Sequence, residues 1–307
     1  MPLLRPTPPV LPDLSDRTVL VTGANAGLGR WAVEQLAGAG ARVLMACRSA
    51  ERAARAADVV RERVPGARLD LLTLDVADLA SVAACARAVD VPLDAVLCNA
   101  GVTETRGRQE TADGLELMMG GNTFGHVALV AQLADRIASG GRVVTVGSIA
   151  HRWSPLDPTD LQAQRSFASF RQYGRSKTAS MAFAFELDRR WRAVGRDAVA
   201  LTAHPGFALD SLSPARPGDG VPAGLRAVVP PARTFSQGKD EGAWPLVHAC
   251  VAEGVRGGEY WGPGGWQEMT GSPALSRARA HARDPLVGAR LWAAVERATG
   301  VSFPITP

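Results

Sequence analysis

The sequence predicts an α/β protein with a doubly wound parallel sheet, and three observations support this fold class. Short apolar runs rich in Val, Leu and Ala alternate with longer segments of helical character. The runs are apolar along nearly their whole length, which is typical of parallel strands covered by helices on both faces. A glycine-rich turn follows the first run, and no linker interrupts the alternation before residue 206. A chain of 307 residues, 46% of them hydrophobic, can bury a large core in a single domain.

Six strands and five connecting helices are expected in chain order. Strands are assigned to β-branched and apolar runs, and helices to Ala- and Arg-rich segments that end near Gly or Pro. Two adjacent glycines, Gly120 and Gly121, are costly inside a helix and predict a kink there. The predicted strands are 17–22, 41–46, 69–74, 93–98, 142–146 and 197–203, and the predicted helices are 30–39, 51–64, 79–89, 114–139 and 167–192.

The composition changes after Pro205-Gly206. Residues 207–235 are rich in Pro, Gly and Ser, and we expect them to form a substrate loop, with a disordered insertion as the alternative. The C-terminal extension is predicted to contain a helix at 242–253, a short strand at 259–261 and an amphipathic helix at 285–299.

The start of the chain is proline-rich and predicts an extended N-terminal arm at residues 1–14. Residues 15–307 are then expected to form one nucleotide-binding and catalytic domain. The arm lacks the charged and apolar parts of a signal peptide, and no apolar run is long enough for a membrane span, so none is expected.

The composition also argues against several classes of partner. The net charge is +4 without a Lys/Arg block, so no nucleic-acid partner is expected. The five histidines have no metal-ligand spacing, and no metal site is predicted. The four cysteines form no Cys-x-x-Cys pair, which is typical of a cytoplasmic protein.

The turn after the first predicted strand has the spacing of a dinucleotide-binding loop. Gly23 allows a tight turn, Gly27 leaves room for a phosphate beside the backbone, and Gly29 lets the helix pack close to the sheet. The start of the next helix would offer free N–H groups to a pyrophosphate. The turn therefore predicts a Rossmann fold, with a plain tight turn as the alternative.

The pair Tyr173 and Lys177 lies in the predicted helix 167–192. Residues four apart lie on one helix face, so a phenol and an ammonium would point into the same space. A fixed cation favours the phenolate, which would let Tyr173 exchange a proton nearer neutral pH. Because this spacing also arises often by chance, it does not establish catalysis by itself.

Several further motifs follow the predicted strands, and together with this pair they resemble the short-chain dehydrogenase/reductase family. The resemblance covers roughly residues 15–262, with the motifs in the family's order. They are Thr22-Gly23-x-x-x-Gly27-x-Gly29, Asn99-Ala100-Gly101, Ser148, Tyr173-x-x-x-Lys177 and Pro205-Gly206.

The resemblance implies a role for each of four residues. Tyr173 would be the general acid/base, and Ser148 would hydrogen-bond the same substrate oxygen. Lys177 would lower the Tyr173 pKa and bind the nicotinamide ribose, and Asn122 would hold a relay water. Asp75 would contact the adenine, and Asn99 would brace the central sheet. The predicted cofactor contacts are Gly23, Asn25, Gly27, Leu28, Gly29, Arg48, Ser49, Asp75, Val76, Asn99, Ala100, Gly101, Tyr173, Lys177, Pro205 and Gly206.

The end of the second predicted strand indicates which dinucleotide is bound. NAD-binding domains usually place a carboxylate there, whereas this chain has Ala46-Cys47-Arg48-Ser49. Arg48 can bind a 2′-phosphate in bidentate fashion, assisted by Arg30. NADP is therefore preferred over NAD, with a solvent-facing Arg48 as the alternative.

Three stretches are similar to the retinol dehydrogenase-like branch of the family: Ala46 to Arg48, Ser148 to Arg152 and Gly258 to Pro263. This similarity implies hydride transfer between NADP(H) and a lipophilic carbonyl and its primary or secondary alcohol. The chain departs from the family after Pro205-Gly206, where Phe207-Ala208-Leu209-Asp210 lacks the Thr that often touches the cofactor carboxamide.

Two other functions stay open: NADPH-dependent reduction of a carbon–carbon double bond, and a non-catalytic NADP-binding sensor. His151 and His204 flank the predicted site, as structural residues or as a second general acid. Family members form homodimers or homotetramers, and this branch also has monomers. A lipophilic substrate is indicated by apolar residues expected to border the reacting carbon: Trp153, Leu156, Phe207, Leu209, Leu212, Trp261 and Trp266.

Overall fold

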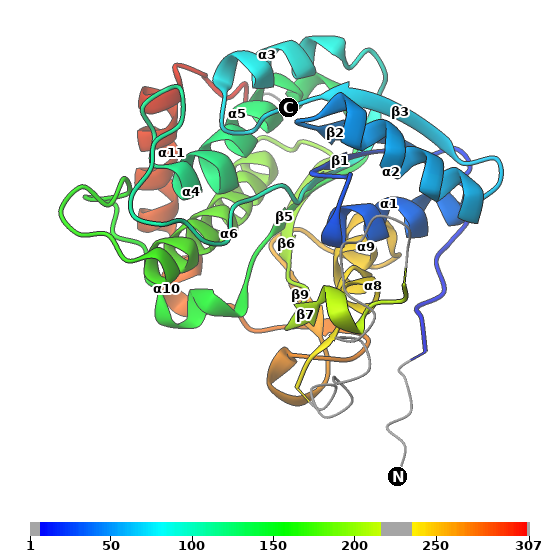
Figure 1. Ribbon diagram of the computed structural model, residues 1–307. Helices are drawn as coiled ribbons and strands as arrows, with labels where there is room; N and C mark the ends of the chain where they lie inside the picture. Colours follow the sequence, from blue (N-terminus) through cyan, green and yellow to red (C-terminus); the bar gives the residue numbers. More distant parts are fainter. Residues whose placement is uncertain (1–6, 216–234, 306–307) are drawn as a thin grey trace.

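One eight-stranded sheet organises the computed structural model, which describes residues 7–215 and 235–305 (Figure 1). The strand order is β10-β9-β6-β5-β4-β1-β2-β3, and every neighbouring pair is parallel except β10 with β9. The order reverses between β1 and β4, and ligands of open α/β sheets bind beyond the strand ends at such a point. The strands are β1 Thr18–Thr22, β2 Arg42–Cys47, β3 Arg68–Thr73, β4 Leu93–Cys98, β5 Ile137–Val146, β6 Ala198–Ala203, β9 Tyr260–Pro263 and β10 Pro273–Leu275.

Helices cover both faces of the sheet, which confirms the doubly wound prediction (Figure 1). Within β1, Leu20 joins one apolar core while Val19 and Val21 join the other, as the period of a strand requires. One face packs on α1 Gly27–Gly38, α2 Ala50–Arg63 and α9 Trp244–Val251, and the other on α3 Leu79–Ala88, α5 Gly125–Gln132, α6 Ser169–Ala193 and α11 Pro285–Thr299.

The predicted helix 114–139 is wrong at its C-terminal end. The structure has α4 Leu117–Met119, a π-helical segment Gly120–Phe124, α5, and a short 3-10 turn Ala134–Arg136. Residues 137–139 already belong to β5, where Ile137 pairs with Leu93 of β4. A short apolar run is compatible with helix or buried strand, and here the pairing with β4 decides.

The π-helical segment lies where the two adjacent glycines predict a kink, so that prediction is confirmed. A π-bulge adds a residue to a helical turn and is frequent at functional sites. At the next residue, Gly125, a Cβ would overlap the carbonyl oxygen of Val76. The helix that carries Asn122 therefore approaches the loop after β3 at backbone distance.

The segment after β6 forms a small parallel ribbon, β7 Ala208–Leu209 with β8 Gln237–Gly238. It leads into the short helix α8 Lys239–Gly242, which precedes α9. Most of the predicted substrate loop, 216–234, lies outside the described residues.

The C-terminal part contains two elements that the sequence did not predict, β10 and α10 Ala280–Arg283. The last helix, α11, begins and ends where its amphipathic pattern predicts. Among the described helices, none combines the length and the apolar character needed to cross a membrane.

Candidate active site

A cleft of about 560 Å³ lies beyond the carboxyl ends of β1, β2, β3 and β4, at the reversal of strand order. Of the predicted cofactor contacts, Leu28, Gly29, Tyr173, Lys177, Pro205 and Gly206 do not line it. Those that do are Gly23, Asn25, Gly27, Arg48, Ser49, Asp75, Val76, Asn99, Ala100 and Gly101. Its walls also include Arg30, Arg52, Asp210 and Lys239, of which the sequence predicted only Arg30.

The glycine-rich turn is shaped to admit a ligand at the start of α1. Gly27 has a φ of +52°, and a Cβ at Gly29 would collide with the carbonyl oxygen of Gly23. Helix α1 has no side-chain cap at Ala26 and no acidic residue in its first turn. Its first N–H groups therefore suit an anion, and these residues fit a dinucleotide pyrophosphate.

Asn99 ties the ends of β4 and β1 together. Its amide nitrogen Nδ2 donates to the carbonyl oxygen of Thr22 at 2.8 Å, and its backbone N–H donates to Thr22 Oγ1 at 2.9 Å. Thr22 Oγ1 also accepts from Ala100 N at 2.9 Å and lies 2.8 Å from His126 Nε2. The floor of the cleft is thus fixed by side chains as well as by the sheet ladder.

The outer end of the cleft is exposed and positively charged. The Arg48 side chain is 70% exposed and lies 3.9 Å from the carboxylate of Asp75. Ser49 caps α2 by accepting a hydrogen bond from Arg52 N at 3.3 Å. Arg30 is buried beside the turn, and its Nε has no hydrogen-bond partner among the described residues.

Next to the inner end of the cleft, beside Gly101, Ser148 after β5 converges with Tyr173 and Lys177 of α6. The Lys177 ammonium lies 5.9 Å from the centroid of the Tyr173 ring and donates to the carbonyl oxygen of Val146 at 3.0 Å. Lys177 is 5% exposed, and this burial lowers its pKa to about 8.

The pKa of Tyr173 differs in direction from the expectation. Burial raises the pKa of the phenol, and the hydrogen bond with Ser148 acts in the opposite direction. The phenol is therefore neutral near neutral pH, which is the form that donates a proton.

Asn122 is held by hydrogen bonds on both sides of its amide. Its Oδ1 accepts from Val102 N at 2.6 Å, and its Nδ2 donates to Val102 O and to Ser176 Oγ, each at 2.9 Å. Its backbone carbonyl accepts from Ser180 Oγ at 2.9 Å. Asn122 thus braces the loop after β4 against α6, next to Tyr173 and Lys177.

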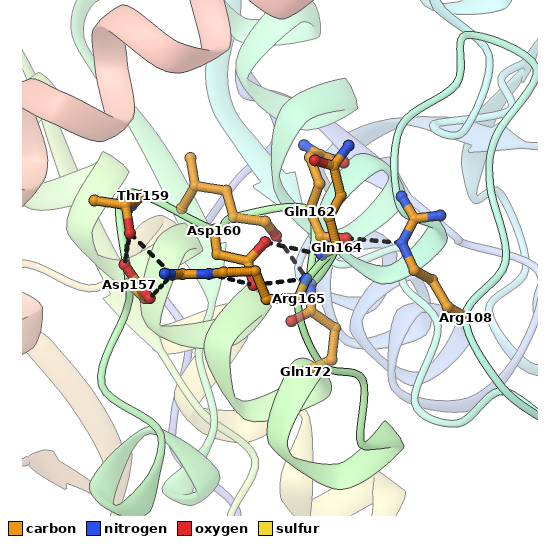
Figure 2. A network of polar contacts seen from close by, with 9 residues as sticks. Arg108, Asp157, Thr159, Asp160, Gln162, Gln164, Arg165 and Gln172 are labelled. Carbon is orange, nitrogen blue, oxygen red and sulfur yellow. Dashed lines mark hydrogen bonds and ion pairs between the residues drawn. The ribbon is translucent and has the colours of Figure 1, made fainter.

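Glu116 and Gln172 form a buried polar contact at the start of α6, which the sequence did not predict. Gln172, the residue before Tyr173, donates to Glu116 Oε2 at 2.7 Å and to Leu161 O at 3.1 Å. Glu116 is fully buried and caps the helix that leads to Asn122. Gln162 and Arg108 continue the network toward the surface, as Figure 2 shows. The helical segments that carry Asn122 and Tyr173 are therefore fixed in position relative to each other.

The two flanking histidines have structural partners. His151 Nδ1 lies 2.6 Å from the carbonyl oxygen of Ser148, and its Nε2 accepts from Arg279 N at 3.3 Å. Burial lowers the His151 pKa to about 4, so the ring is neutral and its Nδ1–H donates to Ser148. His204 Nδ1 accepts from Gly206 N at 3.2 Å. Each ring braces one predicted site loop.

The predicted substrate wall is only partly supported. Trp153 and Trp266 are exposed, at 65% and 60%, and Leu156 and Leu212 are buried. Trp261, which was expected to border the reacting carbon, packs its ring on His248 of α9 with centroids 4.3 Å apart. In a strand neighbouring side chains point to opposite faces, so Tyr260 rather than Trp261 faces α6.

Comparisons with known proteins agree with this architecture. The sequence pattern of the family described as short chain dehydrogenase matches residues 17–206. The chain is 35% identical to the polyprenol dehydrogenase of Mus musculus, over 95% of this chain and 87% of that protein. It is 30% identical to the retinol dehydrogenase 13 of Homo sapiens, over 94% of this chain and 86% of that protein.

A solved structure of an uncharacterized protein from Mycobacterium Paratuberculosis superposes with a TM-score of 0.80 at 31% identity. The superposition covers 97% of this chain and 100% of that one.

Proposed function

Since the chain belongs to the short-chain dehydrogenase family, in its retinol dehydrogenase-like branch, we propose that it transfers a hydride between NADP(H) and a lipophilic carbonyl/alcohol pair. The observation that supports this most directly is the convergence of Ser148, Tyr173 and Lys177 next to Gly101, which lines the cleft.

The preference for NADP rests on the outer end of the cleft. Arg30, Arg48 and Arg52 line it, and the carboxylate nearest to Arg48 belongs to Asp75, after β3 rather than β2. Guanidinium groups suit the bidentate binding of a phosphate. The excess of positive charge at this end favours the dinucleotide that carries the additional 2′-phosphate.

The lipophilic substrate class rests on the exposed rings near the site and on the relatives. Trp153, Phe207 and Trp266 are large side chains left partly uncovered, and such surfaces are typical of apolar ligand pockets. The names of the two relatives refer to lipophilic alcohols, polyprenol and retinol.

We propose a role for each residue of the inner end. When bound, the nicotinamide would supply a hydride to the substrate carbon or remove one from it. In the direction of reduction, Tyr173 donates its proton to the substrate oxygen, and Ser148 hydrogen-bonds that oxygen while it carries negative charge. The buried ammonium of Lys177 stabilises the phenolate that remains, and solvent returns the proton to Tyr173.

The proposal is tested by turnover of purified protein with a panel of lipophilic aldehydes and ketones. NADPH deuterated at the transferable position would carry the label to the former carbonyl carbon. Label on an alkene carbon would instead establish reduction of a double bond. A protein that binds NADPH and reduces no member of the panel would support the alternative of a non-catalytic NADP-binding sensor.

A further inference from the structure

Lys239 lies over the glycine-rich turn, although the sequence places it far from that turn. If Gly27 had a Cβ, that atom would be 3.3 Å from Lys239 Nζ. Lys239 and Gly27 both line the cleft. The ammonium group therefore lies beside the first turn of α1, where a pyrophosphate would meet the free N–H groups.

Three contacts hold Lys239 and the rest of α8 in place. Its N–H donates to Ser213 Oγ at 2.7 Å. The side chain of Gln35 in α1 donates to the carbonyl oxygen of Asp240 at 2.8 Å. A Cβ at Gly242 would lie 3.1 Å from Leu28 Cδ2, so α8 packs closely against the start of α1. Lys239 is therefore held in place by tertiary contacts and is not an unconstrained surface residue.

Asp210 is the ion-pair partner of Lys239 in the structure. Leu209 pairs with Gly238 in the β7–β8 ribbon, so Asp210 and Lys239 leave the ribbon side by side. Their side chains meet at 2.5 Å between Nζ and Oδ2, and they are 25% and 46% exposed for Lys239 and Asp210. An ion pair with this exposure stabilises the fold by about 0–1 kcal/mol, so stability alone gives little reason for it.

The use of lysine at position 239 also suggests a role in binding. The sequence has 34 Lys and Arg residues, and only Lys177 and Lys239 are lysines. Both lie at the predicted cofactor site, one at the inner end and one over the turn. A lysine presents a compact charge at the end of a flexible chain, which suits a phosphate approached from one side.

We infer that Lys239 is a phosphate ligand of the dinucleotide, and that Asp210 is its counter-ion, which the pyrophosphate displaces. The inference rests on the proposed function and adds a binding residue to the same site. Lys239 would supply a cofactor contact on the side where the chain has Asp210 and lacks the Thr after Pro205-Gly206. The carboxylate of Asp210 would repel the pyrophosphate. On cofactor binding, the Lys239 ammonium would therefore leave the Asp210 carboxylate and pair with the pyrophosphate.

The test measures dissociation constants of NADPH, NADH and ADP-ribose by fluorescence or calorimetry, without substrate. Lys239→Met should weaken all three by about tenfold to a hundredfold, because all three carry the pyrophosphate and lose one charge-assisted contact. Lys239→Arg restores the charge and should recover most of the affinity. Adenosine 2′-monophosphate has no pyrophosphate, so Lys239→Met should leave its binding unchanged.

Asp210→Asn should bind all three pyrophosphate ligands several-fold more tightly, because the competing anion is removed. NADPH affinity in Lys239→Met equal to that of the unmodified protein would overturn the ligand assignment. Affinity in Asp210→Asn that is unchanged or weaker would overturn the role as counter-ion. An unmodified protein that binds neither dinucleotide would refute the proposed function itself, which separates the two failures.

Discussion

The inner and outer ends of the cleft differ in nearly every physical property. At the inner end, Lys177 is buried and hydrogen-bonded to the sheet, and the phenol of Tyr173 has a raised pKa. At the outer end, Arg48 is mostly exposed and lies 3.9 Å from its nearest carboxylate. The first region is largely buried and hydrogen-bonded, and the second is exposed and charged.

This difference indicates how each end acts on a ligand. In a low-dielectric region a misplaced donor or charge costs several kcal/mol, so chemistry there depends on single atoms. At an exposed site salt and water weaken each charge, so recognition is graded. Substitutions at the inner end should therefore act on catalysis, and those at the outer end on cofactor preference.

The largest effect is expected for Tyr173→Phe, which removes one hydroxyl and keeps the ring. Loss of the proton donor should lower kcat by about 10³-fold, within the range for general acid–base catalysis. NADPH affinity should stay nearly unchanged, because the phenol does not line the cleft. Steady-state kinetics together with NADPH titration measure both quantities, and normal turnover in this variant would refute the acid/base role.

A second prediction concerns the free energy that the buried Lys177 costs. Its pKa is about 8 in the folded protein and near the ordinary 10.5 when unfolded, so between these values the unfolded chain binds more protons. Stability contributed by this residue therefore rises with pH across that window, and at lower pH the buried charge is destabilising. Lys177→Met should lower turnover yet raise the free energy of unfolding at pH 7 by about 1 kcal/mol.

Denaturant unfolding of both proteins at pH 7 and pH 10 measures this effect. The difference in stability between variant and unmodified protein should shrink as the pH rises, because the other titrating groups are common to both. A variant that is less stable at pH 7, with a difference that does not depend on pH, would show that Lys177 is a structural residue.

Most of the sheet could be predicted because each strand and helix carries its own pattern within a short stretch of sequence. The strands β1, β2, β4, β5 and β6 each contain a buried apolar run, whereas β3 lies at the sheet edge and is partly exposed. Each of the helices α1, α2 and α6 has its own pattern and termini. The sequence failed where tertiary pairing decides: residues 137–139 are strand because β4 lies beside them, and β10 is three residues long and pairs with β9.

The site could be predicted only as far as its motifs reach. The structure brings Ser148 and Tyr173 together, and the cofactor contacts after β1 to β4 line one cleft. The partners that fix these residues are distant in sequence and belong to no motif, such as Glu116 for Gln172 and Lys239 for Gly27. The direction of the Tyr173 pKa also depends on burial, which the spacing of residues along the sequence does not reveal.

The smallest effect is expected at the exposed end, for Arg48→Asp. A carboxylate in place of the guanidinium should repel the 2′-phosphate and shift the ratio of NADP to NAD affinity by about tenfold to a hundredfold toward NAD. Because Arg48 is 70% exposed, the shift should diminish as ionic strength rises. Dissociation constants for both dinucleotides at low and high salt measure it.

Arg48→Lys is the matched control for this last substitution, since it keeps the charge and loses the planar fork. It should retain a preference for NADP that is weaker than that of the unmodified protein. If both variants keep the original ratio, the 2′-phosphate is read by Arg30 or Arg52, the other two arginines that line the cleft. Because Arg30 is buried and has an Nε without a hydrogen-bond partner among the described residues, its contact with phosphate would then resist salt, which distinguishes the two arrangements.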